Sequence, residues 1–289
     1  MLLAINSCFF IHNYSVPADN PPSPAATVVV LRDGAEGLEV LMVRRHEGSG
    51  AFRGAHVFPG GRVDEGDARD RTWSDGVEYA TRRLAALNAA EAVSYHVAAT
   101  RELFEEAGIL LARDRSGAFV SLAGAPEQER FRQYRRDVHA HRRTLGEIAE
   151  REGLRLALDA LTLFAHWVTP PVEGRRFDTR FFVARLPPGQ RPAHDETETT
   201  GSLWSTPAAA IGAAERREIV LPPPTWTTMR ELEPFGTVDV VVDWAAARRV
   251  ERREPRLVQE NGTRALVMPE DRTRFVWTDG YWRPERIEG

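Results

Sequence analysis

The chain has 289 residues, of which 42% are hydrophobic, and a formal net charge of −4. This length and apolar content suit one large globular domain, or one domain with an appendage. The negative balance argues against a general nucleic-acid-binding protein, because such proteins carry basic surfaces.

The first 24 residues predict a flexible leader. Residues 1–10 are apolar but lack the basic flank of a signal peptide. They are also too short to span a bilayer, so no membrane segment is expected. A proline-rich stretch up to residue 24 is typical of a linker. Cys8 is the only cysteine, which excludes an internal disulfide, so we expect a reducing, cytoplasmic location.

Strands are predicted where the folded part begins. Residues 26–31 and 38–43 are apolar runs rich in β-branched side chains, separated by glycine turn signals. A short strand at residues 56–58 leads into Pro59-Gly60-Gly61. The two glycines let the backbone turn tightly and approach another group closely.

A segment at residues 68–91 predicts an amphipathic helix lying on the body of the protein. Val77, Leu84 and Leu87 recur there at helical spacing. We therefore expect one apolar face to dock on the core while the rest faces solvent.

Residues 92–111 predict a helix with two dissimilar faces. At about 100° per residue, apolar side chains such as Val93, Val97 and Phe104 share one face. The opposite face carries three carboxylates: Glu102, Glu105 and Glu106. Like charges at this spacing destabilise a helix by roughly 0.2–0.5 kcal/mol per pair, so something cationic should compensate.

Two kinds of cation fit these carboxylates. One is a set of arginines, such as Arg101, on a solvated acidic face, which is the usual meaning of a charge run. The other is Mg²⁺ or Mn²⁺, which takes carboxylate oxygens and retains water and substrate phosphate as further ligands. The preceding loop favours the divalent cation, because Asp64, Glu65 and Asp67 follow the glycine turn at once.

Two more helices are predicted over residues 127–143 and 145–154. The first carries His139 and His141, a pair that suggests a transition-metal site. Residues two apart do not share a helix face, and arginines flank both histidines. We therefore expect a solvated face there.

Strands predicted over residues 161–170 and 177–186 enclose a turn with two fixed cations, Arg175 and Arg176. These arginines form either a phosphate clamp or an ordinary surface turn, and the sequence favours neither. An acidic loop with Glu196 and Glu198 then precedes another strand.

The remaining chain predicts helices and then short hairpins. Residues 221–224 contain three successive prolines, which predict a rigid linker or a wall near the pocket. Helices are expected over residues 207–214, 225–232 and 238–249. Turn signals in residues 256–287 predict small hairpins.

The central segments resemble the signature of the Nudix hydrolases, G-x5-E-x7-R-E-U-x-E-E-x-G-U, where U is a bulky aliphatic residue. Gly61 supplies the first glycine, and residues 101–109 match every fixed position of the second half. Asp67 stands where the family usually has Glu, and 33 residues separate it from Arg101 instead of the seven of the signature. This split box is similar to that of the peroxisomal-type coenzyme A diphosphatases, whose recurring segments also resemble residues 55–58, 176–179 and 221–224.

The resemblance implies an α/β Nudix fold, a mixed β-sheet sandwiched between helices, with a helical insertion and a C-terminal appendage. The expected organisation is a leader at residues 1–24, a hydrolase domain at residues 25–249 with its insertion at residues 68–91, and the appendage at residues 250–289. The resemblance says nothing about the oligomeric state.

The resemblance also implies hydrolysis of a small-molecule nucleoside diphosphate, dependent on Mg²⁺ or Mn²⁺. Coenzyme A or acyl-coenzyme A is the preferred substrate, with 3′,5′-ADP and (acyl-)4′-phosphopantetheine as products. The implied metal ligands are Glu102, Glu105 and Glu106, with Glu105 and Glu106 also catalytic. Arg101 is expected to fix the loop, and Glu198, or else Glu196, to add a metal contact or serve as general base. The expected substrate-binding residues are Gly60, Gly61, Arg175 and Arg176.

Two alternatives stay open. One is a Nudix pyrophosphatase for ADP-ribose or a dinucleotide. The other is a metabolite-binding Nudix module without turnover. The intact carboxylates of residues 102–106 argue against the second alternative, because a module released from catalysis need not keep a destabilising acidic face.

Overall fold

The computed structural model describes residues 20–46, 53–171, 173–193, 199–260, 262–268 and 273–286. Cys8, most of the expected leader, and the loop with Glu196 and Glu198 lie outside the described residues. Within the described ranges, no helix combines the length and apolar character that a membrane crossing requires.

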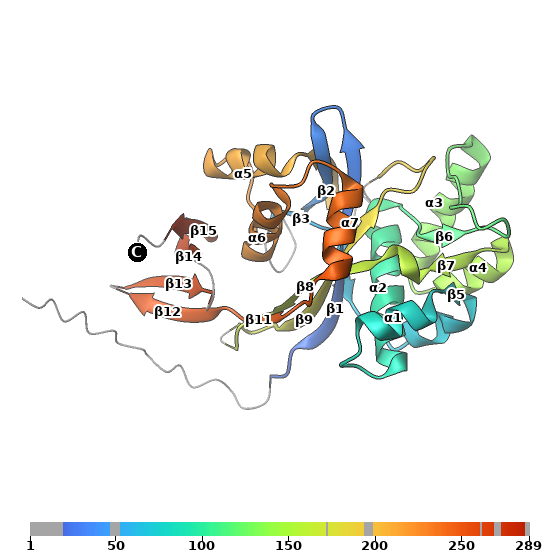
Figure 1. Ribbon diagram of the computed structural model, residues 1–289, viewed down its shortest axis with the longest axis horizontal. Helices are drawn as coiled ribbons and strands as arrows, with labels where there is room; N and C mark the ends of the chain where they lie inside the picture. Colours follow the sequence, from blue (N-terminus) through green and yellow to red (C-terminus); the bar gives the residue numbers. More distant parts are fainter. Residues whose placement is uncertain are drawn as a thin grey trace, which may run out of the picture.

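A mixed eight-stranded sheet forms the centre of the molecule (Figure 1). β1 (Ser23–Gly34) pairs antiparallel with β2 (Gly37–Arg45) and parallel with β9 (Phe177–Arg185). The strand order is β10-β2-β1-β9-β8-β11, with β3 paired to β2 and β4 paired to β1. The other strands are β3 (His56–Val57), β4 (Gly60–Arg62), β8 (Thr162–Val168), β10 (Thr199–Ser205) and β11 (Arg252–Arg253).

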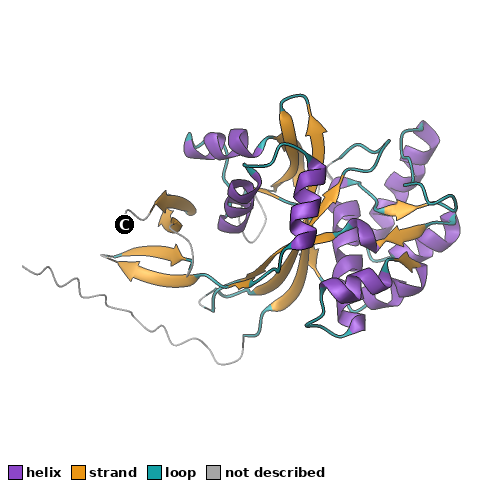
Figure 2. Ribbon diagram, in the orientation of Figure 1, coloured by secondary structure: helices purple, strands orange, loops and turns teal. Residues whose placement is uncertain are grey.

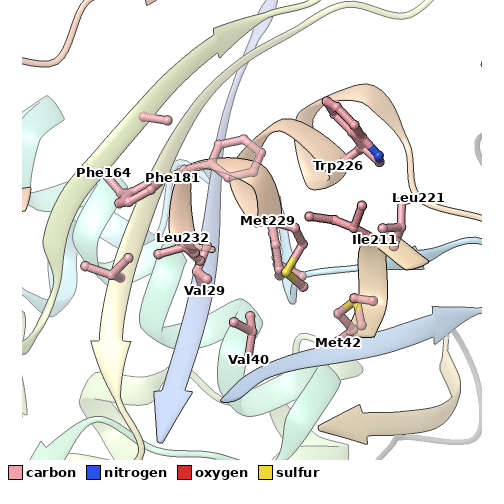
Figure 3. Packing of buried hydrophobic residues seen from close by; sticks show 14 of the residues in the cluster. Val29, Val40, Met42, Phe164, Phe181, Ile211, Leu221, Trp226, Met229 and Leu232 are labelled. Atoms are coloured by element: carbon pink, nitrogen blue, oxygen red, sulfur yellow. The ribbon is translucent and has the colours of Figure 1, made fainter. Parts of the chain in front are cut away.

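Helices cover both faces of this sheet, which confirms the predicted α/β sandwich (Figure 2). On one face, α5 (Pro207–Glu215), α6 (Pro223–Leu232) and α7 (Val238–Ala247) share an apolar cluster with the strands. Val29 of β1 and Met42 of β2 belong to it (Figure 3). Because side chains alternate along a strand, Val28 joins the cluster on the opposite face, beneath α2 (Ala89–Ala107).

The helix α2 is buried on two sides. Ala98 and Leu103 pack against the sheet, whereas Val97 and Phe104 pack into a helical layer beyond it (Figure 1). That layer contains α3 (Ala125–His139), α4 (Leu145–Glu152), the short helix η2 (Leu158–Ala160) and a small sheet of β5 (Ser74–Asp75), β6 (Ala112–Arg113) and β7 (Arg155–Ala157). The expected apolar stripe with Val97 and Phe104 therefore exists, but it faces the helical layer. On the side that faces the sheet, small side chains such as Ala98 let α2 approach closely.

The insertion does not form a single amphipathic helix. It comprises the 3₁₀ helix η1 (Asp67–Trp73), β5 and α1 (Val77–Arg83). Gly76 begins α1 with a left-handed φ of 77°, and a Cβ there would lie 2.6 Å from the Asp159 amide nitrogen. Leu84 packs with the sheet cluster and Val77 with the helical layer. The apolar residues of the insertion therefore pack into two different hydrophobic clusters and do not form one helix face.

The prolines at residues 222–224 open a helix, so their interpretation as a rigid linker was wrong, while the alternative of a wall near the pocket stays a prediction. Pro222 is the N-cap of α6 and Pro223 its first residue. A proline lacks an N–H group, but the first turn of a helix does not need one.

A separate antiparallel sheet follows α7. Its strands are β12 (Arg256–Glu260), β13 (Thr263–Val267), β14 (Thr273–Thr278) and β15 (Tyr281–Arg286). The ring of Phe275 packs edge-on against Trp226 of α6, with centroids 5.6 Å apart. This contact joins the C-terminal sheet to the apolar cluster of α5, α6 and α7.

Candidate active site

The direction of the α2 carboxylates is set by well-defined helix ends. Asn88 and Glu91 form a capping box at the start, each accepting a hydrogen bond from the backbone N–H of the other. Gly108 closes the helix in a left-handed conformation, with φ of 67°. Because both ends of α2 are fixed, the helix cannot rotate freely about its axis, and the side chains of its last two turns point in defined directions.

The glycine turn lies directly against two of the three carboxylates. The Gly60 amide donates a hydrogen bond to Glu106 Oε2 at 3.0 Å. A Cβ on Gly61 would lie 2.5 Å from Glu102 Oε1, so only glycine fits while Glu102 keeps this position. β4 holds the turn in place, because Gly61 pairs with Ala26 of β1. The structure therefore brings both glycines together with Glu102 and Glu106.

Arg101 joins α2 to the loop that follows the glycine turn. Its Nε and Nη2 atoms donate to the two carboxylate oxygens of Asp67 at 2.9 and 3.2 Å. Its Nη1 atom donates to Glu102 Oε1 at 2.9 Å and Glu105 Oε1 at 3.0 Å. Nη2 also donates to the Arg62 carbonyl oxygen at 2.7 Å. One guanidinium thus holds three carboxylates and the backbone of β4.

The surroundings of Arg101 favour its charged form. Burial on its own lowers the pKa of this side chain, but the hydrogen bond with Asp67 and the charges of Glu102, Asp67 and Glu105 raise the pKa overall. Arg101 therefore remains a cation and offsets part of the repulsion within the acidic face. The arginine and the divalent cation, weighed as alternatives from the sequence, need not exclude each other.

The main hydrogen-bonding partner of the Asp67 side chain is Arg101. Both of its carboxylate oxygens accept from that guanidinium, and Oδ2 also accepts from the Asp64 amide at 2.8 Å. Only 4% of the Asp67 side chain is exposed. Asp67, which stands where the family usually has glutamate, therefore anchors the loop to α2.

Two residues of α3 reach the same site, and the sequence analysis missed both. Arg135 Nε donates to the Glu105 carbonyl oxygen at 2.6 Å, and His139 Nδ1 lies 3.6 Å from Glu105 Oε2. The side chain of His139 is 37% exposed, so it stays partly solvated as expected, but its contact with Glu105 was not predicted. The available signal was its spacing of four from Arg135, which puts both side chains on one helix face.

Of the other expected site residues, Arg176 makes its contacts away from the glycine turn. Arg176 donates to the carbonyl oxygens of Thr169 and Asn20 and to Glu254 Oε1, so its guanidinium ties together distant segments of the chain. Arg175 is exposed. Glu198 and Glu196 lie outside the described residues.

The donor set suits a hard divalent cation. Among the described residues, no group of three or more acidic, histidine or cysteine side chains is arranged to hold a metal ion. Mg²⁺ usually needs only one or two carboxylates, with water and substrate phosphate as the other ligands. Glu102 and Glu106, one helical turn apart and both beside the glycine turn, fit that requirement.

Known proteins resemble this chain over the segments just described. A family profile described as the NUDT19 Nudix domain matches residues 77–232. The human protein named acyl-coenzyme A diphosphatase NUDT19 is 30% identical over 260 residues, which cover 76% of this chain and 67% of that protein. The Gallus gallus protein of the same name is 30% identical over 274 residues, covering 81% of this chain and 69% of that protein.

A solved structure supports the same relationship. The NUDIX hydrolase from Alicyclobacillus acidocaldarius aligns with a TM-score of 0.65 and 27% identity, over 78% of this chain and 97% of that one. The segment that the family profile matches contains α2 with its three carboxylates, and α3 with Arg135 and His139.

Proposed function

This chain belongs to the NUDT19 Nudix family and is a Nudix hydrolase, and on that premise we propose that it hydrolyses the diphosphate bond of coenzyme A or acyl-coenzyme A. The products are 3′,5′-ADP and (acyl-)4′-phosphopantetheine, and the reaction uses Mg²⁺ or Mn²⁺. The observation that carries the proposal is the contact of Glu102 and Glu106 with the glycine turn. The names of the human and Gallus gallus relatives support the choice of substrate.

The cation would be held by Glu102 and Glu106, with Glu105 as a further acidic neighbour. A bound divalent cation supplies positive charge that neutralises the diphosphate oxygens and makes a bound water more acidic. Arg101 keeps the carboxylates and the glycine loop in register through its contacts with Asp67, Glu102 and Glu105. Gly60 and Gly61 remain proposed substrate contacts through their backbone, since the positions that their side chains would occupy are filled by β1 and by Glu102.

In the proposed reaction a water oxygen attacks one phosphorus of the diphosphate, and the bond from that phosphorus to the bridging oxygen breaks. The bridging oxygen leaves with the second phosphate. The proton of the attacking water passes to a carboxylate, for which Glu198 remains our first proposal and Glu196 the second. Each product therefore carries one phosphate monoester derived from the diphosphate.

Of the two arginines expected to bind substrate, Arg175 keeps that role in the proposal. Its side chain is exposed in the turn before β9, where a bidentate guanidinium is available to a phosphate. Arg176 is a weaker candidate, because each of its guanidinium nitrogens donates to a group of the protein. The cytoplasmic location expected from the sequence stays a prediction.

A substrate panel tests the proposal. The purified protein is incubated with Mg²⁺ or Mn²⁺ and, separately, coenzyme A, an acyl-coenzyme A, ADP-ribose and NADH, and products are identified by mass. We expect 3′,5′-ADP and the matching phosphopantetheine, and no products when a chelator removes the cation. Preferential cleavage of ADP-ribose or NADH would move the assignment to another Nudix pyrophosphatase. Binding of a panel member without any product would identify a non-catalytic module.

A further inference from the structure

The helix α3 is docked on α2 at the carboxylate-bearing turns. Its residues Phe131, Tyr134 and Val138 are buried in the helical layer. The ring of Phe131 meets Phe104 of α2 edge-on, with centroids 6.5 Å apart. Phe104 immediately precedes Glu105, so this packing brings α3 close to Glu105, where the two helices make polar contacts.

Arg135 and His139 flank the apolar stripe of α3, one helical turn apart. The first donates from Nε to the Glu105 carbonyl oxygen at 2.6 Å. The second has Nδ1 at 3.6 Å from Glu105 Oε2. One residue of α2 is therefore approached by α3 at its backbone and at its side chain.

The other carboxylate oxygen of Glu105, Oε1, has a partner on α2 itself. Oε1 accepts from Arg101 Nη1 at 3.0 Å, and only 9% of the Glu105 side chain is exposed. The Arg135 guanidinium also lies over the end of α2, because a Cβ on Gly108 would be 3.3 Å from its Nη1 atom. A cation at this position interacts favourably with the helix dipole and the last carbonyl oxygens.

We propose that Arg135 and His139 are positioning residues for the reaction: α3 clamps the last turn of α2 and holds the Glu105 carboxylate between His139 and Arg101. The inference rests on the proposed function, since the clamp matters through the acidic cluster that is to receive the divalent cation. A free glutamate side chain samples several rotamers, whereas here Oε1 accepts a hydrogen bond from Arg101 and Oε2 lies 3.6 Å from His139 Nδ1. The cluster is therefore oriented before any cation arrives, and α3 supplies part of that order.

Removing a side chain that orients a metal-binding group typically lowers metal affinity or activity by 10–100-fold. The His139 side chain is 37% exposed, so its replacement can be made without opening the core. His139→Ala deletes the nitrogen. His139→Asn keeps a nitrogen close to the place of Nδ1, because both atoms are bonded to the γ carbon.

The test compares the full-length protein with His139→Ala, His139→Asn and Arg135→Gln. Arg136→Gln is the matched control, because Arg136 contacts Gln133 and Glu129 of its own helix. Mn²⁺ affinity is measured by calorimetry without substrate, and kcat and KM are measured with coenzyme A. Thermal unfolding checks that every variant is folded.

We expect His139→Ala and Arg135→Gln to lose roughly 10–100-fold in Mn²⁺ affinity and kcat, with a smaller change in KM. His139→Asn should recover most of the loss and Arg136→Gln should match the parent. Mn²⁺ affinity and kcat within about twofold of the parent in folded His139→Ala would overturn the clamp, given the effect expected of such a partner. Equal losses in His139→Ala and His139→Asn would also overturn it. If the parent binds Mn²⁺ more tightly than His139→Ala but cleaves no coenzyme A, the proposed substrate fails while the clamp stands.

Discussion

Arg101 and Asp67 are joined by two hydrogen bonds, Nε to Oδ1 at 2.9 Å and Nη2 to Oδ2 at 3.2 Å, although 34 positions separate them in the chain. The pair closes the loop that the insertion lengthens. Loop-closure entropy grows only slowly with loop length, by about 0.6 kcal/mol per doubling. A long insertion is therefore compatible with an intact site, provided that its two ends are fastened together as they are here.

Replacing Asp67 with alanine should destabilise the protein by about 3 kcal/mol, because it removes the main partner of a buried cation. Asp75→Ala is the matched control, since the Asp75–Arg155 pair has side chains 46% and 45% exposed. Breaking an exposed pair should cost ~1 kcal/mol or less. Denaturant unfolding of both variants measures the difference, and equal losses would contradict the anchoring role of Asp67.

Gly61→Ala should reduce activity strongly with little effect on folding. The new methyl group would lie 2.5 Å from Glu102 Oε1. The carboxylate is the flexible end of its side chain and can move away, but it then leaves its place beside the turn. A displacement of about 1 Å at a reacting centre can cost 10²-fold in rate. Gly66→Ala is the control, because a Cβ added there would have no heavy atom of the described residues within 4 Å. Equal activities in the two variants would refute the prediction.

Acid should destabilise the protein through His96. Burial lowers the pKa of this imidazole from 6.5 to about 4, the Ala92 carbonyl oxygen opposes that shift, and the charge of Arg83 adds to it. Nδ1 donates to the Ala92 carbonyl oxygen, and Nε2 is buried without a hydrogen-bond partner among the described residues. Between pH 6.5 and 4 the unfolded chain binds this proton and the folded chain does not, so stability falls as pH falls, by up to about 3 kcal/mol.

His96→Leu isolates that contribution, since all other titrating groups remain. Unfolding free energies of the parent and the variant are compared at pH 7.5, 6, 5 and 4. The parent should lose more stability than the variant across this range. Parallel curves would show that His96 does not carry the effect.

Glu198→Gln should slow turnover by ~10²–10⁴-fold if this carboxylate is the general base. The prediction comes from its position in the loop before β10. Glu196→Gln is the natural comparison, because it removes the same charge from the same loop. A larger loss of kcat at Glu196 would transfer the role to that residue.

Much of the fold follows from local patterns in the sequence. The β-branched runs before residue 45 predict β1 and β2, and the spacing of Val93, Val97 and Phe104 predicts α2. The insertion was harder to predict, because Leu84 and Val77 belong to two different cores, and α1 begins only after a strand and a left-handed glycine. Apolar spacing alone does not say how many surfaces receive the side chains.

Some residues of the candidate site could likewise be identified from the sequence, whereas the roles of others could not. Glu102, Glu105 and Glu106 could be identified because their spacing is local to one helix. The roles of Asp67 and His139 could not, since each depends on contact with a residue 34 positions away along the chain. Such contacts are set by how η1 and α3 pack on α2. The spacing of four between Arg135 and His139 shows that they share a helix face, but not which residue that face contacts.

The most direct test of this account is the rate of coenzyme A hydrolysis as a function of Mn²⁺ concentration, for the parent and for Glu106→Gln. The amide oxygen of glutamine can still accept the hydrogen bond from Gly60 that Glu106 accepts at 3.0 Å, so the substitution removes charge and little else. Loss of like charge should leave stability unchanged or slightly higher, which a melting curve checks. We predict that Glu106→Gln stays folded and that its hydrolysis falls to background at every Mn²⁺ concentration. A folded Glu106→Gln that keeps most of the parent rate at saturating Mn²⁺ would contradict the account.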